Sequence, residues 1–253
     1  MKIKWYWLFK HVVIGPFLRV YNRPDVRGVE NVPATGGAIM ASNHQTVMDS
    51  FFLPLLIPRR ITFLAKQEYF TGKGIIGKLQ RAFFLSVGQV PIDRSSGDAA
   101  RSAIETGIEL VRQGKVLGIY PEGTRSPDGR IYRGKTGVAR MALATGAPVI
   151  PVAMFGTRKA NPIGTWVPRP AKVGMHIGSP IDPIQFVTSR GLSSDSYEAA
   201  RALTDHIIKV LVDMTGNEYV DCYAADVKQS LAAGNGYPDG TEPGFGQKKS
   251  PGE

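Results

Sequence analysis

Apolar segments of strand length alternate with stretches of helical period along most of the chain, and this alternation limits the fold more than any other feature. Apolar runs that end in glycine, proline or polar residues occupy residues 37–42, 60–66, 88–94, 115–121, 147–156 and 171–182. Helical patterns occupy residues 47–57, 74–85, 98–113, 135–145 and 194–216. We therefore expect an α/β fold: a single domain with a largely parallel sheet flanked by helices.

The chain divides into three parts by composition. Residues 1–25 mix aromatic and basic side chains, residues 26–227 carry the strand and helix pattern, and residues 228–253 are rich in glycine, proline and polar residues. The last part has little to bury, so we expect a disordered tail from Lys228 onward. The only cysteine, Cys222, cannot form an internal disulfide.

The N-terminal segment combines features of a membrane-surface helix. Trp5, Tyr6, Trp7 and Phe9 lie among Lys2, Lys4 and Lys10. No apolar stretch approaches the ~20 residues that cross a bilayer. Aromatic and basic side chains together suit the lipid headgroup region, so we expect an amphipathic, membrane-contacting segment. The alternative is a helix that packs its aromatic face on the domain.

The charge of the chain indicates anionic partners. The formal net charge is +10 and the isoelectric point is near 9.7. Nucleic acid, phosphorylated metabolites and anionic lipid surfaces all fit this charge. No nucleic-acid recognition motif accompanies the charge, so we expect no nucleic-acid partner. No His and Cys cluster has metal-ligand spacing, so we expect no metal.

Polar side chains follow the first apolar run, where a strand of the expected sheet ends. Asn43 and His44 come directly after this run, and Asp49 precedes the next one. Ser42 or Thr46 is available to cap the helix that follows. Parallel α/β sheets bind ligands at the ends of their strands. Taken alone, however, this short stretch favours a solvated histidine and a capping aspartate.

Two further strand ends carry polar groups. The run 115–121 ends in a turn that holds Glu122, Gly123, Thr124 and Arg125, and Arg94 leaves the end of another strand just before a helix. Glycine allows a close backbone approach, and arginine supplies the forked donor that suits phosphate. Two arginines at the ends of different strands, together with a histidine and a carboxylate, indicate an anion-binding site.

Together these stretches resemble the glycerolipid acyltransferase family, which includes the bacterial 1-acylglycerol-3-phosphate O-acyltransferases. The resemblance runs from about Gly28 to Pro180 and keeps four blocks in order. The blocks are NHx₄D at Asn43, His44 and Asp49; the Gly88, Pro91, Ile92 and Arg94 set; [FY]PEGTR[ST] at Tyr120–Ser126; and the apolar-proline strand at Val149–Val152. The first and third blocks at this separation make the resemblance specific.

The resemblance implies an O-acyltransferase that moves a fatty acyl group from an acyl thioester to 1-acylglycerol 3-phosphate. His44 would be the general base and Asp49 would orient it. The resemblance assigns Arg94 and Arg125 to the acceptor phosphate. Glu122 would touch the glycerol hydroxyls or hold the arginine loop, and Gly123 and Thr124 would shape that loop.

The resemblance also implies the partners and the place of work. These are a lysophospholipid acceptor, acyl-CoA or acyl carrier protein as co-substrate without a further cofactor, and the cytoplasmic side of the cell membrane with peripheral attachment. Three alternatives stay open: glycerol 3-phosphate as acceptor, a lyso-glycolipid as acceptor, and a non-catalytic protein that binds anionic lipid.

Overall fold

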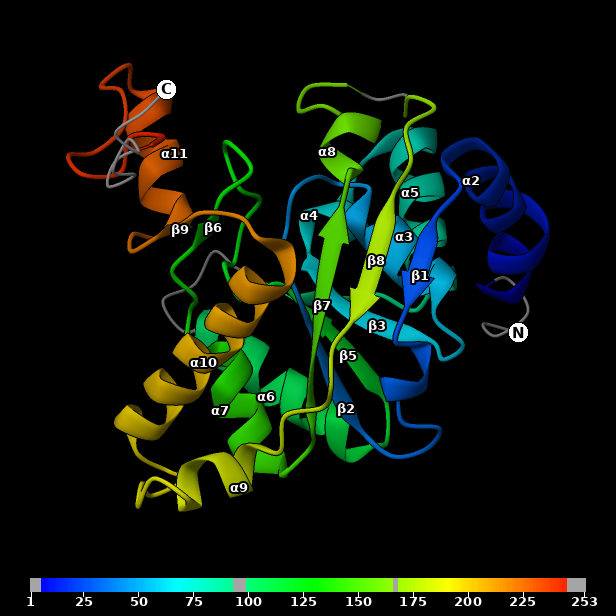
Figure 1. The fold of residues 1–253 in the computed structure, drawn as a ribbon. Coiled ribbons are helices and arrows are strands. Elements are labelled where there is room, and N and C mark those ends of the chain that lie inside the picture. The colour runs from blue at the N-terminus through cyan, green and yellow to red at the C-terminus, as the bar shows by residue number, and fades with distance from the viewer. Residues whose placement is uncertain (1–5, 93–98, 166–167, 245–253) are drawn as a thin grey trace.

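The structure is a computed structural model that describes residues 6–92, 99–165 and 168–244. A seven-stranded sheet forms its centre, in the order β1-β8-β7-β2-β5-β3-β4 (Figure 1). Its strands are β1 (Asp25–Arg27), β2 (Ala38–Ser42), β3 (Ile61–Lys66), β4 (Val90–Ile92), β5 (Val116–Ile119), β7 (Val149–Phe155) and β8 (Gly174–Ile177). A second sheet pairs β6 (Ile131–Tyr132) with β9 (Tyr219–Val220).

Helices connect the strands and cover the large sheet. The longer ones are α2 (Ile14–Asn22), α3 (Asp49–Leu56), α5 (Gly74–Ser86), α6 (Ala99–Arg112), α7 (Gly137–Thr145), α10 (Tyr197–Thr215) and α11 (Ala224–Ala232). The shorter ones are the π-helix η1 (Phe9–Val13), the 3₁₀ helix η2 (Val29–Asn31), α4 (Glu68–Thr71), α8 (Thr157–Ala160) and α9 (Pro183–Thr188). None of the helices that the structure describes is long and apolar enough to span a bilayer.

The expected largely parallel sheet is confirmed. β2, β3, β4, β5 and β7 pair in parallel, whereas β8 is antiparallel to β7 and β1 is parallel to β8. The five parallel strands therefore end at one edge of the sheet, which brings the segments that follow β2 and β5 together. Each expected strand and helix has a counterpart, with ends that differ by a few residues.

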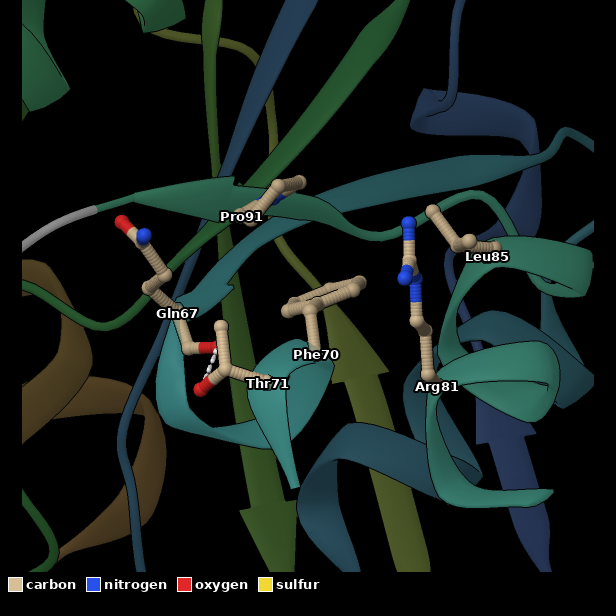
Figure 2. A pocket seen from close by; sticks show the side chains of 6 residues that line it. All are labelled: Gln67, Phe70, Thr71, Arg81, Leu85 and Pro91. Carbon is tan, nitrogen blue, oxygen red and sulfur yellow. Dashed lines mark hydrogen bonds between the residues drawn. The ribbon is translucent and has the colours of Figure 1, made fainter. Parts of the chain in front are cut away.

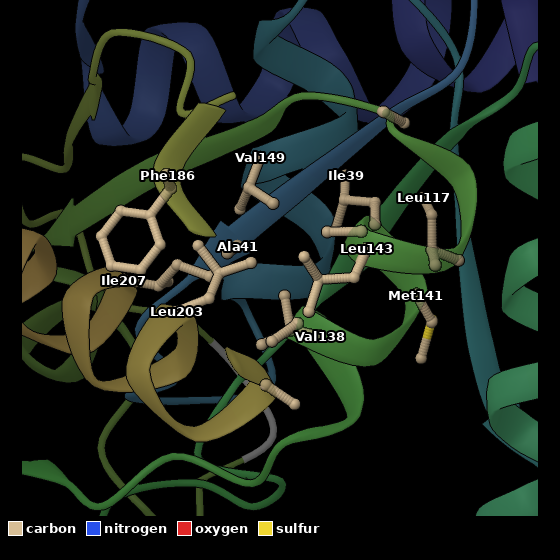
Figure 3. Packing of buried hydrophobic residues seen from close by; sticks show 14 of the residues in the cluster. Ile39, Ala41, Leu117, Val138, Met141, Leu143, Val149, Phe186, Leu203 and Ile207 are labelled. Atoms are coloured by element: carbon tan, nitrogen blue, oxygen red, sulfur yellow. The ribbon is translucent and has the colours of Figure 1, made fainter. Parts of the chain in front are cut away.

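Both faces of the sheet are buried, which explains why its strands are continuously apolar. Ile39 and Ala41 of β2 pack on one face with residues of α7 and α10, such as Leu143 and Leu203 (Figure 3). Ala38 and Met40 of the same strand point to the other face. There they join a cluster that contains Leu18, Phe52, Leu53 and Ile150.

The expected cap of α3 is wrong. Neither Ser42 nor Thr46 caps α3, which begins at Asp49 after Met48 without a side-chain cap. Helix α10 is capped by Ser196, whose Oγ accepts a hydrogen bond from the Ala199 N–H at 3.0 Å. The pattern located both helices, but several hydroxyl residues precede each start and only the backbone path selects among them.

The N-terminal segment is partly turned inward. Tyr6 Oη donates to Pro54 O at 3.0 Å, Lys10 Nζ donates to Ile57 O, and Leu18 joins the core. Burial lowers the pKa of Lys10 to about 8. The expectation that Tyr6 and Lys10 meet lipid is therefore wrong. Lys2, Lys4 and Trp5 lie outside the described residues.

The C-terminal part is more ordered than the sequence indicates. Helix α11 continues past Lys228 to Ala232, and Ala224 and Val227 pack on Tyr132 and Val220. Thr241 is also buried. The expected disordered tail is therefore wrong for residues 228–244, while residues 245–253 lie outside the description. Its composition did not predict this order, because the segment packs on the small β6–β9 sheet and not on the main core.

Candidate active site

The loops that follow β2 and β5 meet at the carboxyl edge of the sheet. β2 and β5 are direct neighbours, with Ala41 opposite Ile119. His44 follows the first strand and Tyr120 follows the second. The main chain joins the loops, because Ser126 N donates to His44 O at 2.7 Å. The first and third sequence blocks therefore form one site.

His44 and Asp49 form a hydrogen-bonded pair. The His44 Nδ1 lies 3.0 Å from Asp49 Oδ2, and the two side chains are 15% and 0% exposed. The same Oδ2 accepts the N–H groups of Gln45 at 2.6 Å and Thr46 at 2.8 Å. Asp49 Oδ1 is buried without a hydrogen-bond partner among the described residues. An ionised Asp49 accepts the Nδ1 proton of His44, which leaves Nε2 as the basic nitrogen.

An aromatic ring fixes the plane of the imidazole. Tyr120 stacks on His44 with ring centroids 3.7 Å apart and an interplanar angle of 9°. The Tyr120 hydroxyl lies 2.9 Å from Ser50 Oγ, and the Phe63 ring also stacks with Tyr120, with ring centroids 5.7 Å apart. The stack and the Asp49 bond together restrict rotation of the His44 ring. Tyr120 occupies the aromatic position of the third block, but no role was predicted for it from the sequence.

Asn43 joins the end of β2 to β7. Its Oδ1 accepts from Met154 N at 2.8 Å and its Nδ2 donates to Met154 O at 3.1 Å. The side chain is fully buried. This amide reproduces a backbone pairing after the strand ladder has ended, so the chain enters the His44 turn in one orientation.

Glu122 holds the two loops together. Its Oε1 accepts from His44 N at 3.2 Å and its Oε2 accepts from Tyr132 N at 3.0 Å. The side chain is 0% exposed. Burial raises the pKa of Glu122 to about 8, against the lowering effect of the two backbone donors. Of the two roles considered for Glu122, these contacts support holding the loop rather than contacting glycerol hydroxyls.

Gly123, Thr124 and Arg125 of the third block are less buried than Glu122. Gly123 has a φ of +75°, which favours glycine, and the side chain of Lys135 lies beside it. Thr124 Oγ1 accepts from Lys228 Nζ at 3.1 Å. The half-buried Arg125 side chain makes no hydrogen bond or ion pair with another described residue. Arg125 therefore offers its guanidinium to solvent or to a ligand.

Arg130, for which no role was predicted from the sequence, differs from Arg125 because it is buried and paired. It is 7% exposed and forms ion pairs with Asp128 at 2.8 Å and Glu218 at 3.1 Å. It also donates to the carbonyl oxygens of Thr241 and Glu242. Arg130 thus ties the C-terminal segment to the loop. The third block ends at Ser126, so it contains Arg125 and not this structural arginine.

A cavity of about 330 Å³ lies beside β4 (Figure 2). Phe70, Leu85 and Pro91 give it apolar walls, and Gln67, Thr71 and Arg81 give it polar ones. Pro91 belongs to the second sequence block. Arg94, the last residue of that block, falls outside the described residues, so its predicted contact with phosphate stays a prediction.

Within the described parts of the chain, no three His, Cys, Asp or Glu side chains are grouped so that they could hold a metal ion.

Known proteins resemble this chain in sequence. The 1-acyl-sn-glycerol-3-phosphate acyltransferase of Bacillus subtilis is 31% identical over 171 residues, which cover 67% of this chain and 76% of that protein. The chloroplastic 1-acyl-sn-glycerol-3-phosphate acyltransferase BAT2 of Brassica napus is 33% identical over 159 residues, which are 62% of this chain. The chain spans only 43% of the length of BAT2.

A solved structure agrees with these sequence matches. The crystal structure of the 1-acyl-sn-glycerophosphate (LPA) acyltransferase PlsC from Thermotoga maritima matches with a TM-score of 0.57 at 27% identity. The match covers 81% of this chain and 80% of that one. A family model described as Acyltransferase matches residues 23–155, which contain His44, Asp49 and the whole third block. The resemblance read from the four blocks is confirmed, and the chain belongs to the acyltransferase family.

Proposed function

We propose that this protein transfers a fatty acyl group from an acyl thioester to the free hydroxyl of 1-acylglycerol 3-phosphate and so forms phosphatidic acid. The observation that carries the proposal is the His44–Asp49 pair at 3.0 Å, held directly against the loop of Arg125. The Bacillus and Brassica relatives are 1-acyl-sn-glycerol-3-phosphate acyltransferases by name, which supports the choice of acceptor.

The geometry supports a direct transfer in which the substrate hydroxyl is the nucleophile. His44 Nε2 takes the hydroxyl proton while the oxygen attacks the thioester carbonyl. The new C–O bond forms, the C–S bond breaks, and the thiolate leaves with the proton that His44 received. Buried Asp49 stabilises the imidazolium between these steps. No enzyme nucleophile is needed, and acyl-CoA or acyl carrier protein would supply the thioester.

The loop after β5 supplies a cation for the acceptor phosphate. Arg125 has no hydrogen-bond or ion-pair partner among the described residues, whereas nearby Arg130 is buried and doubly paired. A guanidinium in this state can offer two parallel N–H donors to a phosphate. Lys135, in the segment between β6 and α7, lies beside Gly123 and adds positive charge. We assign the phosphate to Arg125 and, by resemblance, to Arg94.

Apolar surface for the acyl chains is present near the second block. Phe70, Leu85 and Pro91 line the cavity beside β4, and Arg81 stands at its side (Figure 2). Such a mixture suits a hydrocarbon chain attached to an anionic group. Glycerol 3-phosphate and lyso-glycolipids stay as alternative acceptors. A non-catalytic lipid-binding role would not explain the alignment of His44 with Asp49 and Tyr120.

An acyl-transfer assay with matched acceptors tests this proposal. We expect wild-type protein to acylate 1-acylglycerol 3-phosphate faster than monoacylglycerol, glycerol 3-phosphate or a lyso-glycolipid, with acyl-CoA and acyl carrier protein compared as donors. His44→Ala should lower kcat by ~10²–10⁴-fold, since it removes the general base. Arg125→Ala should slow only phosphorylated acceptors, and Arg125→Lys should recover part of the rate. A folded His44→Ala protein with near wild-type turnover contradicts the mechanism.

We further propose peripheral attachment to the cytoplasmic side of the membrane through the outer face of the N-terminal helices. Among the described residues, eleven large apolar side chains are exposed, and five of them lie between residues 7 and 20: Trp7, Val12, Val13, Phe17 and Val20. Helix α2 lies along the outside of the domain, on the side opposite α10 and α11 (Figure 1). Exposed Arg19 and Arg23 add charge that attracts anionic lipid.

Point substitutions test this attachment better than deletion, because deletion would remove buried Leu18 and Lys10. Phe17→Ser with Val20→Ser should weaken binding to anionic vesicles and leave the melting temperature unchanged. Ile163→Ser is a matched control, since Ile163 is 52% exposed and lies elsewhere in the chain. Equal vesicle binding by the double variant and the wild type would exclude this face as the contact.

A further inference from the structure

A second cavity, of about 470 Å³, lies at the edge of the sheet opposite His44. Its lining includes Thr62, Val90 and Val116, which lie at or near the beginnings of β3, β4 and β5. These strands run parallel to one another and to β2, whose carboxyl end carries His44. The cavity is therefore separate from the His44 site, although Gly88 of the second block lines it.

The cavity gathers positive charge without a counter-charge. Arg59, Arg60 and Lys115 line it, and no Asp or Glu does. None of the three cations forms a salt bridge with a described residue. Three cations around one space repel one another, so an anion in that space would stabilise the arrangement.

Arg59 is fixed in place by backbone carbonyls. Its Nη1 donates to Pro33 O at 2.8 Å, and its Nη2 donates to Gly36 O at 2.8 Å and to Gly114 O at 2.9 Å. These carbonyl oxygens are neutral acceptors, so they hold the Arg59 guanidinium in place without cancelling its charge. The Arg59 side chain is thus already ordered before any ligand binds, so binding costs little additional side-chain entropy there.

Arg60 is fixed by packing and retains an unused donor. Its guanidinium lies over the Tyr6 ring, 5.2 Å from the centroid, and its Nε is buried without a hydrogen-bond partner among the described residues. A Cβ at Gly88 would come within 1.8 Å of Arg60 Nη2, and Gly88 has a φ of +81°. Glycine at position 88 therefore makes room for this guanidinium. A buried N–H donor without an acceptor is costly, so an incoming acceptor gains from satisfying it.

We propose that this cavity is a second anion-binding site that takes the phosphate group of a phosphate monoester. Guanidinium groups bind phosphate oxygens through paired N–H donors. Exposed Lys115, whose Nζ also donates to Gln113 Oε1 at 2.7 Å, adds a third positive charge. The volume falls within the usual range of about 300–1,000 Å³ for small-molecule sites, and Leu85, Val90 and Val116 add apolar wall. The ligand is therefore a phosphate attached to a small organic group, either free in solution or in a lipid head.

Binding measurements on the full chain test the site independently of acyl transfer. Isothermal titration with glycerol 3-phosphate provides the soluble arm, carried out in an Arg125→Gln background to weaken binding at the first site. Vesicles with and without phosphatidic acid provide the lipid arm. We expect Arg60→Gln to weaken binding at least about tenfold, as the loss of a charge-assisted hydrogen bond predicts.

Two further variants make the result decisive. Lys115→Gln changes an exposed residue and should also weaken binding if Arg60→Gln fails to fold. Arg101→Gln is the matched control, because exposed Arg101 lies on α6 and pairs with Glu105. Loss of binding to glycerol 3-phosphate identifies a soluble ligand, and loss confined to phosphatidic acid vesicles identifies a lipid head. Unchanged affinity for both probes in Arg60→Gln and Lys115→Gln overturns the proposal.

Discussion

The loops after β2 and β5 lie against each other, and each buries one carboxylate. Asp49, in the first, faces the imidazole of His44 and gathers three N–H donors on a single oxygen. Glu122, in the second, uses both oxygens and bonds only to backbone N–H groups of His44 and Tyr132. The first carboxylate acts on a side chain that can gain a proton, and the second joins two segments of main chain.

This difference decides whether an amide side chain can take over the hydrogen bonds of each carboxylate. An asparagine at position 49 can place its Oδ1 where Asp49 Oδ2 lies, and its NH₂ group then occupies the space of the unpartnered Oδ1. A glutamine at position 122 has only one carbonyl oxygen for two backbone donors. The same chemical change therefore removes charge from one loop and breaks a hydrogen bond in the other.

The largest expected effect is on turnover in Asp49→Asn. The hydrogen bonds are retained, but the negative charge that stabilises the His44 imidazolium is lost. We expect kcat to fall by ~10²–10⁴-fold, with little change in acceptor KM or in melting temperature. Steady-state kinetics measures kcat and acceptor KM, and calorimetry on the same preparation measures the melting temperature. A melting temperature that falls as far as that of Glu122→Gln would remove the distinction between the loops.

Next in size is the stability loss in Glu122→Gln. The new NH₂ group faces the N–H of His44 or Tyr132, and one buried donor loses its acceptor. Such a loss costs about 1–3 kcal/mol, which lowers the melting temperature of a domain of this size by about 2–4 °C per kcal/mol. Residual activity should exceed that of Asp49→Asn, because His44 keeps its partner. The reverse order of residual activities would assign Glu122 a direct part in the reaction.

The raised pKa of Glu122 gives the second loop its own pH dependence. Burial raises this pKa from 4.5 in the ordinary state to about 8 in the folded protein. Between these values the folded state retains a proton that the unfolded chain releases, so stability falls as pH rises through this window. Urea unfolding at about pH 5 and about pH 8 should show a smaller stability difference in Glu122→Gln than in wild type. Equal differences would mean that Glu122 does not titrate in this window.

The comparison also shows how far sequence reasoning reaches. The strand and helix pattern gave the parallel sheet, because strands buried on both faces are continuously apolar, as Ile39 and Met40 are. The blocks placed His44, Asp49 and Arg125 on one edge. They did not separate the roles of the two carboxylates, since spacing does not reveal whether Glu122 faces a ligand or the backbone.

Two end segments escaped prediction for a different reason. Tyr6 and Lys10 have the composition of a lipid contact, yet they bond to carbonyl oxygens at the end of α3. Residues 228–244 have the composition of a tail, yet Arg130 binds the carbonyl oxygens of Thr241 and Glu242. In both places backbone carbonyls of a distant segment provide the partners. Such acceptors exist at every residue, so sequence composition does not mark them.

The smallest expected effect lies where the C-terminal segment touches the second loop. Lys228 Nζ donates to Thr124 Oγ1 at 3.1 Å, directly before Arg125. Helix α11 is held mainly by Ala224 and Val227, so Lys228→Met should leave the fold intact. Losing this bond should let the loop move, and we expect acceptor KM to rise by less than about tenfold with kcat unchanged, as suits one hydrogen bond of about 0.5–1.5 kcal/mol.

Lys209→Met is the matched control, because Lys209 lies on α10 and pairs with exposed Asp213. If Lys228 positions the phosphate-binding loop, KM should rise for 1-acylglycerol 3-phosphate and stay constant for monoacylglycerol. An equal rise for both acceptors would mean that α11 supports the loop as a whole and not its phosphate contact. A fall in kcat without a change in KM would instead connect α11 to His44, through the bond between Ser126 N and His44 O that joins the two loops.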